Sequence, residues 1–277
     1  MRVEDLDGER SRPELIDGVL ADLEWLGLDW DGPVVLQSQG KVLLDAALAD
    51  LYARGLAYPC TCTKADVRAA QSAPQAGDGE LRYPGTCRDR WPSLEAAARE
   101  AGRPPALRFR VSPEHITVDD GFAPPATFDP SAEVGDFPVA RASGLPAYQL
   151  AAVADDARAG VTEVVRGDDL LPSTARQMLL QRALGLPHPR WFHVPLVLDG
   201  EGRRLAKRAS ALSLAELRAR GVDVRAIVGW AAQSAGQEVP PRVRASEVTA
   251  GFVLAKLPHT PVRLDAARLA ALTEALP

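Results

Sequence analysis

The sequence predicts an α/β protein built around a mostly parallel sheet. Strand-like apolar runs alternate with segments of helical periodicity in both halves of the 277-residue chain. This alternation is typical of parallel strands that are joined by helices. Between the two halves, residues 56–135 show short, antiparallel-looking runs and indicate an insertion. From residue 213 onwards the pattern is helical, so we expect a helical C-terminal part.

The composition is that of an ordinary globular enzyme. Hydrophobic residues make up 46% of the chain and charged residues 25%, which is common for soluble proteins. No run approaches the length of a membrane span, and Arg2, Glu4 and Asp5 stand where a signal peptide would begin. We therefore expect a cytoplasmic protein without a membrane partner. We also expect a monomer. The net charge of −5 disfavours nucleic-acid binding over the whole surface but is compatible with a local basic face.

The first half of the predicted sheet begins at the N-terminus. A strand candidate over residues 1–3 ends in an acidic cluster that includes Glu4. A helix is expected to begin near Pro13, because proline is favoured in a first helical turn, and to end at Gly27, a typical C-terminal cap. A second helix is expected over residues 41–54.

All three cysteines of the chain lie within one short window of the insertion, at Cys60, Cys62 and Cys87. A Cys-x-Cys pair that leads out of a strand, with a third cysteine beyond a loop rich in glycine and proline, can place three thiolates around a tetrahedral zinc ion. Tyr83 is the candidate fourth ligand, since a bound cation can lower the pKa of a phenol. The alternative is that the cysteines are buried as small apolar side chains. The spacing leaves both interpretations open.

The second half of the sheet is expected to begin with two strand-like runs over residues 137–142 and 148–154. Another strand ends at Arg166, where a parallel strand would deliver a guanidinium into a ligand crevice. There it could hold a carboxylate through two hydrogen bonds, or it could form a salt bridge with a neighbouring aspartate. Ser173 is expected to cap a helix that reaches about Leu184.

A cationic loop over residues 202–208 follows a strand candidate at 192–198 and a turn. Its four cations could neutralise the charge of a transferring phosphoryl group, although a solvated basic turn has the same composition. Tyr148 and Glu4 are ambiguous when each is considered alone. They fit a half-buried aromatic residue and an exposed acid at a strand end.

The histidines and the C-terminal segment give no catalytic signal. Helices are expected near residues 213–220, 223–235 and 264–274, and the last of these is interpreted as core packing or a terminal cap. The four histidines lack metal-binding spacing and are interpreted as structural or surface residues: His115, His188, His193 and His259.

Taken together and in order, these motifs resemble the class I glutamyl-tRNA synthetase family over roughly residues 1–235. The similarity includes an RxEDxD strand end, a zinc-binding insertion, a glutamate-binding half and a KMSKS-type loop in its LAKR variant. The corresponding segments are Arg2-Val-Glu-Asp-Leu-Asp, Cys60-Thr-Cys62 with Tyr83-x-x-x-Cys87, Ala147-Tyr148-Gln-Leu-Ala, Asp155-Asp156, Gly160-Val-Thr-Glu-Val-Val-Arg-Gly-Asp-Asp-Leu-Leu and Arg204-Leu-Ala-Lys207-Arg.

The resemblance implies a Rossmann-like class I catalytic domain in four parts. The first half of this domain would occupy residues 1–56 and the zinc-binding insertion residues 57–135. The second half, with the KMSKS-like loop, would occupy residues 136–212, and a helical region would follow over 213–277. The zinc pattern and the absence of a separate anticodon-binding domain resemble the short branch of the family that glutamylates queuosine in tRNA(Asp).

The same resemblance implies a reaction and a set of site residues. ATP, with Mg²⁺, would activate L-glutamate, and the glutamyl group would pass to queuosine in the anticodon of tRNA(Asp). By family analogy, Glu4 would bind the substrate ammonium, Tyr148 and Arg166 would hold its polar groups, with Arg166 on a carboxylate, and Lys207 would stabilise the ATP phosphates. One structural zinc ion would be held by Cys60, Cys62, Tyr83 and Cys87, and the KMSKS-like loop would comprise Arg204, Leu205, Ala206, Lys207 and Arg208.

Two departures from the family pattern leave alternatives open. The HIGH-type motif has no counterpart, so we expect a further segment of about forty residues ahead of Met1. The loop continues with Ala209-Ser210-Ala211, where the family often has a His-Gly-Ala run. The alternatives are a truncated glutamyl-tRNA synthetase that charges a tRNA 3′ end and a non-catalytic remnant that binds glutamate or tRNA.

Overall fold

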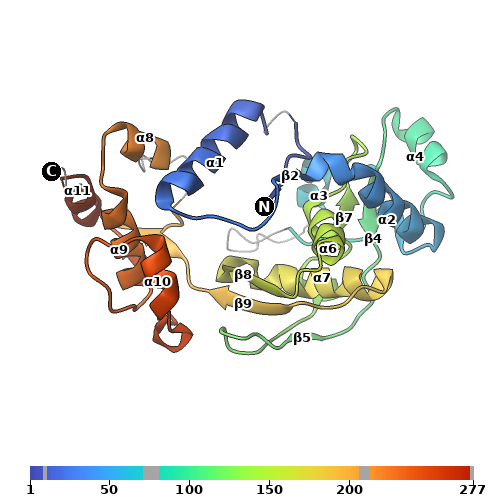
Figure 1. Ribbon diagram of the computed structural model, residues 1–277. Coiled ribbons are helices and arrows are strands. Elements are labelled where there is room, and N and C mark those ends of the chain that lie inside the picture. Colours follow the sequence, from blue (N-terminus) through green and yellow to red (C-terminus); the bar gives the residue numbers. More distant parts are fainter. Residues whose placement is uncertain (9–10, 71–80, 206–212, 275–277) are drawn as a thin grey trace. The chain divides into compact units, whose positions relative to one another are not determined.

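The computed structural model describes residues 1–8, 11–70, 81–205 and 213–274, and the chain divides into two units (Figure 1). The central unit comprises Glu4–Asp7 and Leu36–His193. The terminal unit comprises Met1–Val3, Gly8–Val35 and Val194–Pro277. The described residues contain no helix with the length and apolar character needed to cross a membrane.

The core of the central unit forms between a three-stranded antiparallel sheet and three helices. The strands are β3 (Ala57–Cys60), β4 (Ala106–Phe109) and β7 (Pro138–Ala140), in the order β3-β4-β7. The helices are α2 (Lys41–Ala53), α6 (Tyr148–Arg158) and α7 (Leu171–Leu184), and α6 packs against both of the others. Fully buried side chains from the sheet and the helices form one apolar cluster, including Leu51, Val139, Leu150 and Leu180.

Two further strand pairs complete the central unit (Figure 1). β5 (Ile116–Val118) and β6 (Ala126–Phe128) form an antiparallel pair, and β8 (Glu163–Gly167) pairs with β9 (Arg190–Val194). The segment after β5 also bridges to β9, through Asp120 and Trp191. The remaining short helices are η1 (Gln37–Gly40), α3 (Lys64–Ala69), α4 (Leu94–Ala101), α5 (Pro130–Glu133) and η2 (Asp168–Leu170).

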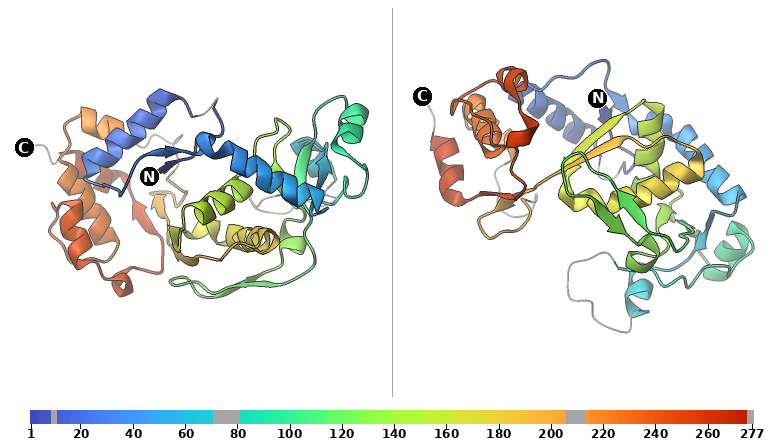
Figure 2. Two further views of the ribbon diagram at one scale, coloured as in Figure 1. Left: turned by 45° about the vertical axis from the view of Figure 1, so that its right-hand side comes forward. Right: turned by 90° about the horizontal axis from the view of Figure 1, so that it is seen from below.

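The terminal unit is mainly helical. α1 (Pro13–Leu26) packs beside α8 (Leu214–Ala219) and α9 (Val224–Ser234), as the views in Figure 2 show. An ion pair of 3.2 Å between Arg218 and Asp22 links α8 to α1. The other elements are the paired strands β1 (Arg2–Val3) and β2 (Val35–Leu36), the parallel pair β10 (Val197–Asp199) and β11 (Val262–Leu264), and α10 (Ala245–Gly251), η3 (Leu254–Lys256) and α11 (Ala266–Glu274).

Several elements expected from the sequence are confirmed. α1 begins at Pro13, and Gly27 ends it with a φ of 72°, the left-handed conformation that glycine adopts without steric cost. α2 and the strand at the N-terminus are also present.

Three expectations about local structure are wrong. Residues 148–154 belong to helix α6 and not to a strand, because the segment is rich in alanine, the strongest helix former, and its buried face includes Leu150 and Val153. Ser173 lies inside α7 and does not cap it, since Pro172 already occupies the first turn. The expected strand over 192–198 is divided into β9 and β10 on either side of Pro195, a residue that cannot donate to a sheet ladder.

The expected parallel sheet is also less continuous than predicted. Within the described ranges the strands form five small sheets of two or three strands each. β10 and β11 pair in parallel, whereas β3, β4 and β7 are antiparallel. Strands of two to five residues form few hydrogen bonds with their neighbours. Packing of the helices therefore stabilises much of the structure around the site.

Candidate functional site

Arg166 lies near the end of β8 with its guanidinium half-buried and held on one edge. Its Nε donates a hydrogen bond to His193 Nε2 at 3.0 Å, and its Nη2 donates to Thr174 Oγ1 at 2.7 Å. His193 belongs to β9, which pairs with β8, and Thr174 belongs to α7. The strand pair and the helix therefore hold one conformation of the arginine side chain.

Asp120, just after β5, supports the histidine from behind. Its Oδ2 lies 2.5 Å from His193 Nδ1, and both side chains are fully buried. Its Oδ1 accepts hydrogen bonds from the backbone amides of Phe122, Ala123 and His193, at 2.9, 2.8 and 3.0 Å. We call Asp120, His193 and Thr174 the positioning network.

The electrostatic environment of this network favours a neutral histidine between two charged groups. Burial lowers the pKa of His193, and the nearby Arg166 lowers it further, while Asp120 partly opposes the shift. Burial alone would raise the pKa of Asp120, but its hydrogen bonds, with those from His193 foremost, lower it overall. Burial also lowers the pKa of Arg166, and the Tyr148 phenol and Asp156 partly compensate.

The lowered pKa of His193 predicts how the stability of the protein depends on pH. Since the pKa of His193 is lowered on folding, the unfolded chain binds a proton first as the pH falls, and this favours unfolding. The contribution of neutral His193 to the free energy of unfolding is therefore fully present above the ordinary histidine pKa of about 6.5, and it is lost as the pH falls below that value. Urea unfolding at about pH 7.5 and about pH 5.5 should show a smaller difference in His193→Gln than in the wild type. An equal difference in both proteins would contradict the assignment.

Tyr148 and Glu4, the other two residues predicted to bind substrate, belong to the same unit as Arg166. Tyr148 is the first residue of α6 and is 44% exposed. Its phenol lies close enough to Arg166 to raise the pKa of the guanidinium. Glu4 is exposed in the acidic segment after β1. Asp5 attaches this segment to η1, because it accepts hydrogen bonds from the Ser38 amide at 2.8 Å and the Ser38 hydroxyl at 2.6 Å.

The predicted cationic loop is only partly within the described residues. Arg204 bridges to Leu198 of β10, and Leu205 is exposed. The turn before the loop is held by Asp199, whose Oδ1 accepts from the Arg203 amide at 2.9 Å. Ala206, Lys207 and Arg208 lie outside the described residues.

The three cysteines form a cluster at the end of β3. The Sγ atoms of Cys60, Cys62 and Cys87 all lie within 4.8 Å of one another. Tyr83 Oη lies 3.4 Å from Cys60 Sγ and 3.8 Å from Cys62 Sγ, and it accepts a hydrogen bond of 2.8 Å from the Cys87 amide. A tetrahedral zinc–thiolate site requires sulfur atoms about 3.8 Å apart. The three thiols are therefore close enough to hold a metal ion, and the phenol oxygen of Tyr83 lies beside them.

Arg108 of β4 places a positive charge against this cluster. Its Nε donates to Cys60 Sγ at 3.2 Å, and its guanidinium lies 3.8 Å from the centre of the Tyr83 ring. A cation in this position compensates the excess negative charge that several thiolates bring to one ion. Burial would raise the pKa of Cys87, but hydrogen bonds from Tyr83 and its other neighbours lower it to about 7. Burial raises the pKa of the neighbouring Cys62 to about 12, so these two thiols differ widely in how readily they ionise.

Sequence reasoning missed the positioning network and Arg108. His193 was interpreted as a structural or surface residue, yet it contacts the arginine predicted to bind substrate. Its partner Asp120 lies 73 residues away along the chain, so no local spacing indicates the pair. The one available signal for Arg108 is its place on the strand that alternates Leu107 and Phe109 with polar residues.

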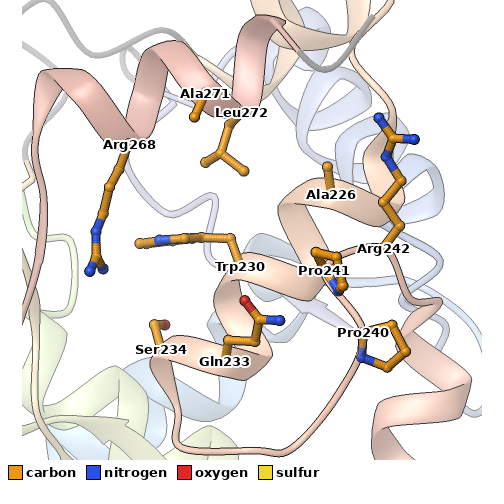
Figure 3. Close-up of a pocket in the computed structure, with 10 residues that line it drawn as sticks. All are labelled: Ala226, Trp230, Gln233, Ser234, Pro240, Pro241, Arg242, Arg268, Ala271 and Leu272. Atoms are coloured by element: carbon orange, nitrogen blue, oxygen red, sulfur yellow. The ribbon is translucent and has the colours of Figure 1, made fainter. Parts of the chain in front are cut away.

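A separate cavity of about 790 Å³ lies in the terminal unit between α9 and α11. Figure 3 shows the Trp230 ring beneath Leu272, with its edge facing the Arg268 side chain. None of the predicted site residues lines this cavity. The functional assignment therefore rests on Arg166 with its positioning network and on the cysteine cluster.

Comparisons with known proteins agree with the motifs. The family model described as tRNA synthetases class I (E and Q), catalytic domain, matches residues 1–231. The chain is 48% identical to a glutamyl-Q tRNA(Asp) synthetase of Symbiobacterium thermophilum, covering 99% of this chain and 87% of that protein. It is 45% identical to the protein of the same name in Nocardia farcinica, covering 94% of this chain and 80% of that protein.

Solved structures show the same fold at lower identity. A glutamate tRNA ligase from Elizabethkingia meningosepticum superimposes with a TM-score of 0.78 at 23% identity, and the match covers 98% of this chain. A glutamate-tRNA synthetase from Elizabethkingia anophelis gives the same TM-score and identity. The chain spans 61% and 62% of these two longer proteins.

Proposed function

The chain belongs to the family of class I tRNA synthetases (E and Q), and from this premise we propose that it activates L-glutamate with ATP and transfers it to queuosine in the anticodon of tRNA(Asp). The choice of tRNA rests on the names of relatives that share 41–48% identity with it. The choice of glutamate is supported by Arg166, a half-buried guanidinium beside Tyr148 whose position is fixed from behind.

In the proposed substrate complex, Arg166 holds a glutamate carboxylate through two parallel hydrogen bonds. Tyr148 contributes its hydroxyl next to the guanidinium, and Glu4 accepts the substrate ammonium group. A half-buried arginine is suited to this task, because it stays charged and its planar fork matches a carboxylate. The catalytic parts proposed are residues 1–56 and 136–212, with the insertion at 57–135 and the helical region at 213–277.

The proposed reaction has two steps. An oxygen of the glutamate α-carboxylate attacks the α-phosphorus of ATP, and the bond to pyrophosphate breaks, which gives glutamyl-adenylate. A hydroxyl group on the cyclopentene ring of queuosine then attacks the activated carbonyl, and AMP leaves. Mg²⁺ would accompany ATP and neutralise its phosphates. Lys207, in the loop that begins at Arg204, would add a positive charge where negative charge develops.

Replacing Lys207 with alanine in the full-length protein should lower the turnover of glutamyl-adenylate formation by about a hundredfold. Glutamate affinity should change little, because the charge acts mainly on the transferring phosphoryl group. Glutamate-dependent exchange of pyrophosphate into ATP measures the first quantity. Arg225→Ala is the matched control, since Arg225 is exposed and pairs with Asp223 beyond the loop. Full exchange activity in Lys207→Ala would refute the loop assignment.

The tRNA product tests the proposed function as a whole. We expect glutamate to be attached to tRNA(Asp) from queuosine-producing cells, at the modified anticodon base. We expect no attachment to the same tRNA from a strain that cannot make queuosine. Nuclease digestion followed by mass spectrometry identifies the acylated nucleotide. Acylation of the 3′-terminal adenosine, or equal acylation of both tRNAs, would show instead that the protein charges tRNA ends.

We also propose that Cys60, Cys62, Cys87 and Tyr83 hold one zinc ion with a structural role. The distances between the sulfur atoms and the position of the phenol oxygen support this assignment. When bound, zinc would join the end of β3 to the segment around Cys87. Because the four protein ligands fill a tetrahedral ion, they leave no open position for substrate.

A further inference from the structure

We propose that Asp120 and His193 are positioning residues that aim Arg166 at the substrate carboxylate, by keeping His193 in its neutral form with the proton on Nδ1. The inference rests on the proposed function, in which Arg166 binds glutamate. His193 and Asp120 are fully buried, so neither can reach the substrate directly. Their effect must pass through the guanidinium.

The first step is the orientation of the Asp120 carboxylate. Three backbone amides, those of Phe122, Ala123 and His193, all donate to Oδ1. Oδ2 is thereby directed to His193 Nδ1 at 2.5 Å. An ionised carboxylate only accepts hydrogen bonds, so Nδ1 must carry the proton. The backbone around Asp120 therefore determines the tautomer of His193.

The second step is the consequence at the other ring nitrogen. With the proton on Nδ1, neutral His193 presents a lone pair at Nε2. This lone pair accepts the hydrogen bond from Arg166 Nε at 3.0 Å and lies 3.2 Å from Thr174 Oγ1. A proton on Nε2 would instead place a donor against a donor and, in the imidazolium form, a positive charge against a guanidinium. The charged groups that act on His193 are Asp120, Arg166 and Asp168 of η2.

The third step is the edge of Arg166 that is left for substrate. Nε and Nη2 form the side edge of the guanidinium, and both donate into the positioning network. On the outer edge, Nη1 and the second N–H of Nη2 are not used by His193 or Thr174, and the Tyr148 phenol lies beside the guanidinium. A carboxylate can bind this edge end-on through two parallel hydrogen bonds. The network thus selects which edge of Arg166 faces the ligand and fixes its direction.

Asp120→Asn is the sharpest test, because the three backbone amides still require an oxygen at the Oδ1 position. The amide nitrogen of the new side chain must then occupy the Oδ2 position and donate to His193 Nδ1. This forces the proton of neutral His193 onto Nε2, where it opposes the Arg166 Nε–H. We expect the dissociation constant for glutamate to rise about ten- to hundredfold, as expected when a buried donor loses its acceptor.

NMR of protein labelled with ¹⁵N-histidine identifies the tautomer directly. The chain has four histidines, so four ring systems need to be assigned. We expect the Nδ1–H form of His193 in the wild type and the Nε2–H form in Asp120→Asn. Asp119→Asn is the matched control, since Asp119 is the exposed neighbour in the same segment. In this variant, the tautomer of His193 and the affinity for glutamate should both equal those of the wild type. Thermal unfolding by circular dichroism establishes that each variant is folded.

A second pair of variants separates positioning from packing. In His193→Gln, the amide oxygen can replace Nε2 as the acceptor for Arg166, so glutamate affinity should be partly retained. In His193→Leu, which fills similar space without an acceptor, affinity should fall as far as in Asp120→Asn. Equal affinities in the glutamine and leucine variants would overturn the proposal.

Two further results would overturn the proposal, and a third would refute the proposed function on which it rests. A wild-type His193 that carries its proton on Nε2 at neutral pH contradicts the network directly. So does an Asp120→Asn protein that binds glutamate as tightly as the wild type after the tautomer has switched. Wild-type protein that binds no glutamate by calorimetry would instead refute the proposed function, a result distinct from equal binding by wild type and variant.

Discussion

Replacing Cys87 with serine should remove about one zinc ion per chain and lower the unfolding temperature of the central unit sharply. Cys87 is buried, and its sulfur lies with those of Cys60 and Cys62 within 4.8 Å. The binding of structural zinc contributes about 10–16 kcal/mol in small domains, which equals or exceeds the whole stability of an ordinary domain, about 5–15 kcal/mol. Chelation of the wild-type metal should have the same effect. Elemental analysis and thermal unfolding with and without chelator measure both quantities.

The matched control for this experiment is Thr63→Ala. It removes the N-terminal cap of α3, directly after Cys62, without touching a sulfur atom. The loss of a cap costs about 1 kcal/mol, so this variant should be slightly destabilised but should keep its metal. Tyr83→Phe tests the phenol oxygen, which should weaken metal binding if it is the fourth ligand. Purified wild-type protein without metal, and with an unfolding temperature that chelators do not change, would show that the cysteines are simply buried.

Replacing Arg166 with alanine should weaken glutamate binding by about a thousandfold. Truncating one partner of a buried charged pair costs about 2–5 kcal/mol, much of it because the other charge is left buried without compensation. In this protein the substitution also removes the donor to His193 Nε2 and to Thr174 Oγ1. Arg166→Lys should give an intermediate loss, because a single ammonium cannot serve the network and a carboxylate with the same geometry.

Arg190→Ala is the control for the Arg166 variants. Arg190 lies on the neighbouring strand β9, and its ion pair with Glu163 is between two exposed side chains. Such pairs contribute little to stability, so glutamate affinity should stay at the wild-type value. Isothermal calorimetry on the full-length proteins, with thermal unfolding to confirm folding, provides the comparison. Glutamate binding by Arg166→Ala within a few-fold of the wild type would assign the carboxylate to another residue.

The sequence predicted best those elements that are specified by local chemistry. Pro13 and Gly27 mark the two ends of α1 because each restricts or permits a particular backbone conformation, whatever the rest of the fold does. The error at residues 148–154 has the opposite cause. There, Leu150, Ala151, Ala152 and Val153 are all buried, so the segment has no polar face from which a period could be read.

The cysteine cluster could be predicted because its residues lie within one window of the sequence. Cys60 and Cys62 were placed with Cys87 and Tyr83 from their spacing, and the structure brings the four together. The positioning network could not be found in this way. Asp120 is held by backbone amides and by His193, and the contacts with His193 exist only once the segment after β5 lies beside β9.

Because two hydrogen bonds already hold the side edge of the Arg166 guanidinium, the side chain loses most of its rotational freedom during folding. The side-chain entropy of a free arginine is about 2 kcal/mol. Glutamate therefore meets a side chain that needs little further ordering, and preorganisation of this kind raises affinity without adding a contact. The binding entropy of glutamate should accordingly be less unfavourable than that of a ligand captured by an exposed, mobile arginine.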